Sequence, residues 1–143
     1  MKTTLNAIRE HSPCADGWEQ LLRHLGKTQA DDDPLTILTV LESNGLDDAL
    51  WALRAVQGHD REIRLFAVWC ARQVQHLMTD ARSYHALDVA EQFANGLASE
   101  TDLHAAWAAA LDAAGDAAGD AAGDAQKQKL IEICDGRANE RAL

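Results

Sequence analysis

The chain has 143 residues, 47% of them hydrophobic, which suits one folded domain and excludes a disordered polypeptide. Its 13 Lys and Arg residues face 23 Asp and Glu residues, a formal net charge of −10. So acidic a chain repels nucleic acid, and no stretch approaches the roughly 18 apolar residues of a membrane helix. We therefore expect neither direct nucleic-acid binding nor membrane insertion. The cysteines are three in number and form no CxxC pair, so we expect no disulfide framework and a cytoplasmic setting.

Helix start and stop signals recur along the chain. A capping residue or a first-turn proline precedes each predicted helix, at Thr3 or Thr4, Ser12-Pro13, Asp33-Pro34, Asp47, Asp60, Asp80 and Ser99. Glycines mark the predicted ends, at Gly26, Gly45, Gly58, Gly96 and Gly136. The segment from Ile37 to Val40 is also compatible with a strand, but the sequence offers no partner strand, so a helix is favoured. The signals predict an all-α bundle of six to seven helices with residues 1–98 as its core.

The C-terminal part, residues 99–143, is predicted as a long Ala/Gly-rich helix that packs on this core within one domain. Ser99 and Asp102 resemble a capping box, and no proline follows. A continuous helix to Cys134 would be about 54 Å long, against a radius of gyration of about 14 to 15 Å for a compact domain of this size. The helix would therefore extend from the domain or pack against a second chain, unless it breaks at its glycines.

Residues 112–125, the AAGD tract, repeat the word Ala-Ala-Gly-Asp. In a helix, the aspartates form a slowly rotating acidic stripe beside a stripe of glycines, and each glycine costs about 1 kcal/mol relative to alanine. Three interpretations remain open: a face for close backbone packing, including a homodimer seam; a neutral expansion; or an acidic surface for a basic partner. On the third interpretation the partner-binding residues are Asp112, Asp116, Asp120 and Asp124.

Two further features are candidates for contact with a partner. Trp107 is the one large aromatic side chain in the alanine-rich helix, and tryptophan is enriched at binding hot spots. Arg61 and Arg64 lie one helical turn apart, a spacing that permits a shared phosphate or carboxylate, although pairing with neighbouring acidic residues is the simpler interpretation.

The sequence carries little sign of catalysis. The His59-Asp60 pair resembles the dyad of helical metal-dependent phosphohydrolases, and His24 is an upstream candidate ligand. Asp60 also has a sufficient role as a helix cap, so this enzyme remains the alternative hypothesis. The preferred prediction includes no catalytic residue, no metal and no cofactor.

Several segments resemble small accessory proteins of phages and prophages of Gram-negative bacteria: SPCADGWEQLLRHLGKTQADDDPL, SNGLDDALWALRAV and HDREIRLFAVWCARQV. The region from Asp60 onward is also similar to helical proteins described as putative immunity proteins. The resemblance implies a phage origin and an intracellular setting, and it brings no catalytic residues.

These observations together predict a non-catalytic protein that acts by protein–protein binding. An inhibitor of a bacterial defence system, similar in role to anti-CRISPR proteins, fits an acidic phage protein that meets a basic host or defence protein. A structural homo-oligomer is a further alternative.

Overall fold

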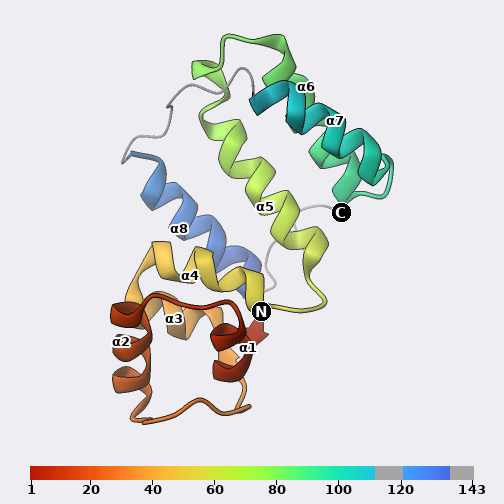
Figure 1. Ribbon diagram of the computed structural model, residues 1–143. Helices are drawn as coiled ribbons and strands as arrows, with labels where there is room; N and C mark the ends of the chain where they lie inside the picture. The colour runs from red at the N-terminus through yellow and green to blue at the C-terminus, as the bar shows by residue number, and fades with distance from the viewer. Residues whose placement is uncertain (112–120, 136–143) are drawn as a thin grey trace. The chain divides into compact units, whose positions relative to one another are not determined.

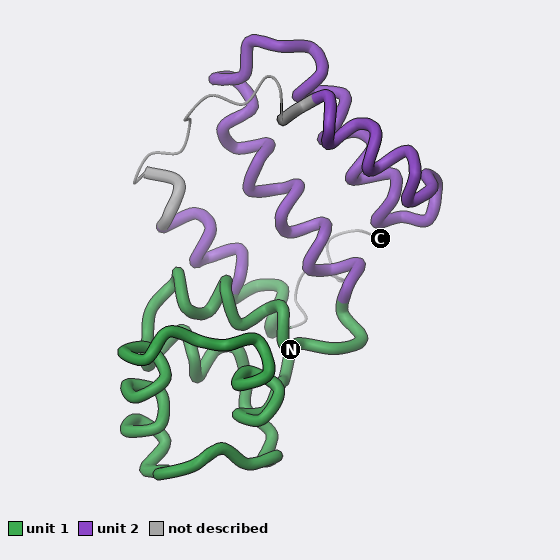
Figure 2. The backbone as a smooth tube through the Cα atoms, in the orientation of Figure 1, with its two compact units in different colours: residues 1–59, 131–143 green, residues 60–130 purple. Residues whose placement is uncertain are grey.

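The computed structural model describes residues 1–111 and 121–135. The described residues are mostly helical, which confirms the all-α class (Figure 1). Among these residues, the strands form one small sheet of two strands. The chain divides into two compact units: unit 1 comprises residues 1–59 and 131–143, and unit 2 comprises residues 60–130 (Figure 2).

Unit 1 begins with a short antiparallel strand pair. Strand β1 (Lys2–Thr3) pairs with β2 (Leu35–Thr36), and Thr3 lies opposite Leu35. The helices of this unit are α1 (Leu5–Glu10), α2 (Ala15–Leu25), α3 (Ile37–Asn44), α4 (Leu46–Ala52) and the 3-10 turn η1 (Leu53–Ala55).

The core of unit 1 gathers around α3, which packs against both α2 and α4. Its buried side chains are Leu5, Ile8, Leu21, Leu35, Ile37, Val40, Leu41, Ala49, Ala52, Leu53, Ala55 and Val56. Thr3 is the buried polar residue of the described chain, and its hydroxyl donates a 2.7 Å hydrogen bond to the Ala55 carbonyl. The bond ties strand β1 to the turn after α4.

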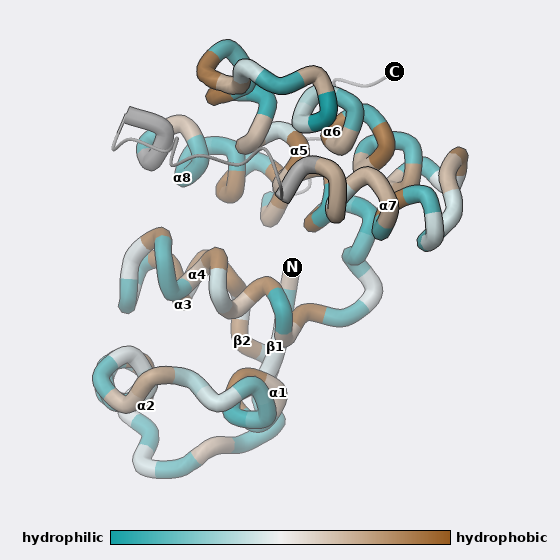
Figure 3. The backbone as a smooth tube through the Cα atoms, turned by 45° about the horizontal axis from the view of Figure 1, so that its top comes forward, coloured by the Kyte–Doolittle hydropathy of each residue, from teal (hydrophilic) through white to brown (hydrophobic). Residues whose placement is uncertain are grey.

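Unit 2 contains α5 (Asp60–Gln73), the 3-10 turn η2 (Gln75–Leu77), α6 (Ala81–Ala94) and α7 (Glu100–Leu111). Helix α6 packs against both α5 and α7, and the small residues Ala86, Val89 and Ala106 form a buried cluster. Figure 3 shows hydrophobic positions interleaved with hydrophilic ones along α5, as expected for an amphipathic helix. The boundary between the two units falls within helix α8 (Ala121–Cys134): unit 2 ends at Leu130, and the last segment of unit 1 begins at Ile131.

Three predicted caps are confirmed. The Thr4 hydroxyl accepts a hydrogen bond from the Ala7 amide at the start of α1, and Asp80 accepts one from the Arg82 amide at the start of α6. Ser99 and Asp102 form the reciprocal bonds of a capping box, at 2.9 Å and 3.2 Å between backbone nitrogen and side-chain oxygen.

Other predicted starts are wrong by a few residues. Helix α2 begins at Ala15 with Cys14 as its N-cap, so Pro13 lies before the helix. Helix α3 begins only at Ile37, because Leu35 and Thr36 pair with β1 and the Thr36 hydroxyl caps the helix. Gly45, with a positive φ of 89°, is the N-cap of α4, and Asp47 lies in its first turn.

Helices α7 and α8 both lie within the stretch predicted as a single long helix from residue 99, and the described residues carry eight labelled helices. Whether they are continuous stays a prediction, since residues 112–120 of the AAGD tract lie outside the described residues. The division into a core of 1–98 and a packing helix of 99–143 also stays a prediction. In the described ranges, no helix is long and apolar enough to cross a membrane.

Candidate functional site

A groove of about 470 Å³ crosses unit 2 and is formed by α5, α6 and α7. Most of its lining is apolar, and its polar members are Arg64 and His104. We call it the Trp107 groove; its lining residues are Arg64, Ala67, Val68, Ala71, Leu87, Ala90, Phe93, Leu103, His104 and Trp107. The structure thus brings together two residues that sequence analysis proposed separately, Trp107 and Arg64.

Trp107 is 62% exposed although it is one of the largest apolar side chains in the protein. It lies in the second half of α7, where the residues around it are mostly alanines that offer little surface to cover an indole. Leu103 and His104, three and four positions earlier, line the same groove, as helical spacing requires. The Ser99–Asp102 capping box fixes the start of α7 and therefore the face on which Trp107 lies.

The guanidinium of Arg64 lies over the ring of Phe93, 4.8 Å from its centroid. This cation–π contact holds the Arg64 stem along the groove. No carboxylate forms an ion pair with Arg64 within residues 1–111 and 121–135. The cation therefore remains available to a ligand at the groove.

Arg61 has a different partner, since its Nη2 donates a 2.7 Å hydrogen bond to Asn95 Oδ1, and it does not line the groove. The predicted anion contact shared by Arg61 and Arg64 therefore stays a prediction.

Arg72 connects α5 to α6 beside the groove. Its Nη2 lies 2.6 Å from Asp88 Oδ1 and 3.1 Å from Glu91 Oε2, and its Nη1 donates to Gln75 Oε1 at 2.9 Å. The hydrogen bond to Asp88 is the main reason why the pKa of Arg72 is raised, with Glu91 adding to it. This network fixes one wall of the groove against the other.

The predicted acidic contact residues are mostly outside the described chain. Asp112, Asp116 and Asp120 belong to the part of the AAGD tract that the structure does not describe, whereas Asp124 is exposed in the first turn of α8. Their role as a partner-binding stripe stays a prediction.

The alternative metal site was predicted from His24, His59 and Asp60. His24 lies in the last turn of α2, His59 precedes α5 and Asp60 begins it. Among the described residues, no three His, Cys, Asp or Glu side chains gather as a metal ion would require.

The three thiols differ in accessibility. Cys14 is exposed at the N-cap of α2, whereas Cys70 and Cys134 are partly buried. Burial raises the pKa of both the Cys70 and the Cys134 thiol, which lowers their fraction of reactive thiolate near neutral pH. Cys14 is therefore the thiol most accessible to a reagent.

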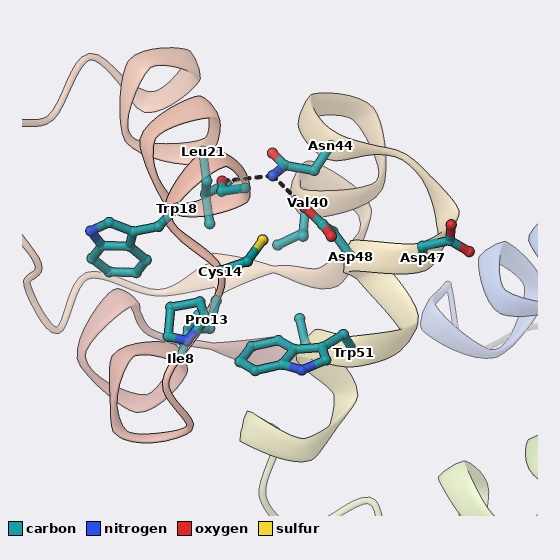
Figure 4. Close-up of a pocket in the computed structure, with 12 residues that line it drawn as sticks. Ile8, Pro13, Cys14, Trp18, Leu21, Val40, Asn44, Asp47, Asp48 and Trp51 are labelled. Atoms are coloured by element: carbon teal, nitrogen blue, oxygen red, sulfur yellow. Dashed lines mark hydrogen bonds between the residues drawn. The ribbon is translucent and has the colours of Figure 1, made fainter.

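A second pocket, of about 230 Å³, lies in unit 1 between α1, α2, α3 and α4 and was not predicted from the sequence. We call it the Trp18–Trp51 pocket; its lining residues are Ile8, Pro13, Cys14, Gly17, Trp18, Leu21, Val40, Asn44, Asp47, Asp48, Trp51 and Ala52. Trp18 and Trp51, which Figure 4 labels among the lining residues, are both partly buried. Trp18 and Leu21 lie three residues apart on α2 and therefore share a helical face, but this spacing alone does not show that the face borders a pocket.

No protein-family model, no curated protein and no solved structure matches this chain.

Proposed function

We propose that this protein is a non-catalytic binding protein and that its Trp107 groove contacts a protein partner. The observation that carries the proposal is the exposure of Trp107, at 62%, on the edge of an apolar groove. Large exposed aromatic residues beside apolar concavities are the usual anchors of protein interfaces, and their loss typically costs 2 kcal/mol or more of binding energy, about a thirtyfold change in affinity.

The groove supplies the elements of such an interface. Its apolar floor accepts a partner's apolar side chains, and Arg64 offers a cation that is already ordered on Phe93. Arginine and tryptophan are both enriched among residues that dominate binding energy. The interhelical network of Arg72 keeps the groove formed without a partner, which lowers the ordering cost of binding.

Charge indicates the general nature of the partner. The chain has a formal net charge of −10, and Glu100 and Asp102 lie exposed in the first turn of the same helix as Trp107. We propose a partner with a basic surface, because complementary charge accelerates association and suppresses wrong partners. The aspartates of the AAGD tract would extend this acidic contact.

The narrower proposal names the biological setting. The resemblance of the quoted segments to phage and prophage accessory proteins supports an inhibitor of a bacterial defence system that works in the host cytoplasm. It rests on that resemblance and on the acidic charge alone.

The test compares the wild-type chain with Trp107→Ala and with Leu77→Ala as baits in a Gram-negative bacterial lysate. Leu77 is the matched control, because it is also a large exposed apolar residue of unit 2, at 52%, and does not line the groove. A protein that the wild-type chain captures, and a bait-free control does not, is a candidate partner, and the groove is its contact surface only if Trp107→Ala loses it and Leu77→Ala retains it. Its affinity is then measured by calorimetry with purified components.

We expect Trp107→Ala to weaken the purified complex by about thirtyfold or more, and Leu77→Ala by less than about threefold. Equal retention by both variants would refute the groove as the contact surface. Light scattering of the free protein tests the remaining occupant, a second copy of the chain: a dimer that Trp107→Ala dissociates would assign the groove to self-association instead.

A further inference from the structure

The Trp18–Trp51 pocket contains a carboxylate that lacks a cationic partner. Asp48 is partly buried, and its Oδ2 accepts a 2.7 Å hydrogen bond from Asn44 Nδ2. In the described ranges of the chain, no Lys or Arg forms an ion pair with Asp48. A partly buried carboxylate whose one side-chain hydrogen-bond donor is neutral is stabilised strongly when a cation donates a further hydrogen bond to it.

The position of this carboxylate is fixed from two sides. The Asn44 amide group donates both to Asp48 and to the Gly17 carbonyl, each at 2.7 Å, so it links α2, α3 and α4 (Figure 4). Gly17 approaches so closely that an added β-carbon would lie 2.6 Å from Asp48 Oδ2. Asp48 is therefore held in place, and the hydrogen bond from Asn44 occupies only one acceptor position of the Asp48 carboxylate.

Two indoles form the apolar walls of the same pocket. Figure 4 shows Trp18 and Trp51 on two sides of it with Pro13 between them, and Cys14 on the side of the Asn44–Asp48 hydrogen bond. Trp51 already binds one guanidinium, since Arg54 lies over its ring at 4.6 Å from the centroid. Arg54 also donates to the Trp51 carbonyl and does not line the pocket, so it leaves Asp48 without an ion pair.

We propose that the Trp18–Trp51 pocket binds the guanidinium of an arginine side chain that a basic protein partner inserts. The inference rests on the proposed function only in naming a protein as the source of that arginine. A volume of about 230 Å³ is below the roughly 300–1,000 Å³ of pockets for drug-sized ligands, so it suits one side chain.

Guanidinium fits these walls better than ammonium does. Guanidinium is planar and stacks on aromatic faces. It is also more weakly hydrated than ammonium, so it loses less hydration free energy on entering an apolar pocket. Its several donors point outward in a plane, which allows a hydrogen bond to Asp48 while its face lies against an indole. Asp47, exposed beside Asp48 and also part of the lining, adds negative charge at the edge.

Cys14 provides the readout, because its thiol is exposed and lines the pocket. The experiment measures the rate of Cys14 alkylation by iodoacetamide, resolved by peptide mass spectrometry, without and with a capped Gly-Arg-Gly peptide. Capped Gly-Lys-Gly, capped Gly-citrulline-Gly and free arginine are the comparison ligands. Citrulline retains the shape of arginine but has no charge.

We expect the arginine peptide to protect Cys14 and the citrulline peptide to leave its rate unchanged. Asp48→Asn retains the hydrogen bond with Asn44 and should weaken protection about tenfold. Asp32→Asn, the same chemical change at an exposed position outside the pocket, should leave protection as in the wild type. Each rate is compared with that of the same variant without peptide, so that a change in the rate without peptide is not counted as protection.

If the citrulline peptide protects Cys14 as well as the arginine peptide does, the pocket is not a cation site. Equal protection by the lysine peptide would overturn the preference for guanidinium. Stronger protection by free arginine would overturn the proposal that a protein supplies the arginine. If Asp48→Asn does not fold, the indole N–H resonances of Trp18 and Trp51 in the wild type decide: they should shift with the arginine peptide and not with the citrulline peptide. Trp107→Ala should leave Cys14 protection intact, so failure of the groove and failure of this pocket are distinguishable.

Discussion

Gly17 on α2 lies so close to Asp48 on α4 that a β-carbon at position 17 would clash with the Asp48 carboxylate. A β-carbon at Gly17 would lie 2.6 Å from Asp48 Oδ2 and 3.0 Å from Cys14 Sγ. The Asn44 amide holds both partners, through the Gly17 carbonyl and the Asp48 carboxylate. With a β-carbon at position 17, the Asp48 carboxylate would have to shift against the hydrogen bond from Asn44 that holds it.

Gly17→Ala should destabilise the protein even though alanine is the better helix former. The gain in helix propensity is at most about 1 kcal/mol, and overpacking typically costs about 1–3 kcal/mol. We expect a net loss of about 1 kcal/mol in the free energy of unfolding, measured by urea denaturation. In an Asp48→Ala background the same substitution should cost less, because its closest contact is gone. An equal cost in both backgrounds would show that the contact with Asp48 does not limit residue 17.

Thr3→Val should destabilise the strand pair of unit 1. Valine has the shape of threonine but cannot donate to the Ala55 carbonyl, which lies in a residue only 5% exposed. An unsatisfied buried acceptor costs about 1–3 kcal/mol, and urea denaturation measures this loss. Thr3→Ser is the control that retains the hydroxyl and loses only a methyl group. A Thr3→Val variant as stable as the wild type would contradict the proposed importance of this bond.

Local signals made the helix caps predictable. In the Thr4, Asp80 and Ser99 caps the donor and acceptor lie within three residues of each other, so the sequence pattern contains the whole interaction. The strand pair was not predictable in the same way. Strands of two residues have no period, and the partners Thr3 and Leu35 are far apart in the sequence.

The two candidate sites also differ in how far the sequence could predict them. Trp107 was predicted as a contact residue because alanines surround it in the sequence, and its exposure follows from the same fact. The link between Asn44 and Gly17 spans 27 positions and depends on how α2 packs against α3. Helical periodicity gives the face on which Trp18 lies, but not the shape of the surface opposite it.

Arg82→Gln should change the titration of Asp80. The hydrogen bonds from the Arg82 side chain, and then from its amide, hold the pKa of Asp80 at about 2, below its ordinary 3.8. A lowered pKa in the folded state means that Asp80 stabilises the fold fully above pH 3.8 and loses this contribution as the pH falls towards 2. The variant retains the amide of the N-cap, so the pKa should rise only part of the way to 3.8.

The ¹³C chemical shift of the Asp80 carboxyl group, followed by NMR between pH 5 and about 1.5, measures the pKa of Asp80 in the wild type and in Arg82→Gln. Asp124, exposed in the first turn of α8, is an internal reference that the substitution should not affect. A pKa of about 2 in Arg82→Gln would show that the backbone cap alone accounts for the shift.

Trp107→Ala should leave the stability of the free protein nearly unchanged. Because Trp107 is 62% exposed, most of its surface contributes nothing to the folded state, and we expect a loss of about 1 kcal/mol or less in the free energy of unfolding. Ile37→Ala is the contrast: Ile37 is 0% exposed in the core of unit 1, and its truncation should cost about 2–5 kcal/mol. Urea denaturation of the two variants under the same conditions gives the comparison. A large tryptophan side chain that contributes little to folding, but whose removal abolishes partner capture, is the combination that a binding anchor requires. If Trp107→Ala costs as much as Ile37→Ala, the indole stabilises the fold of unit 2, and the groove loses its principal contact residue.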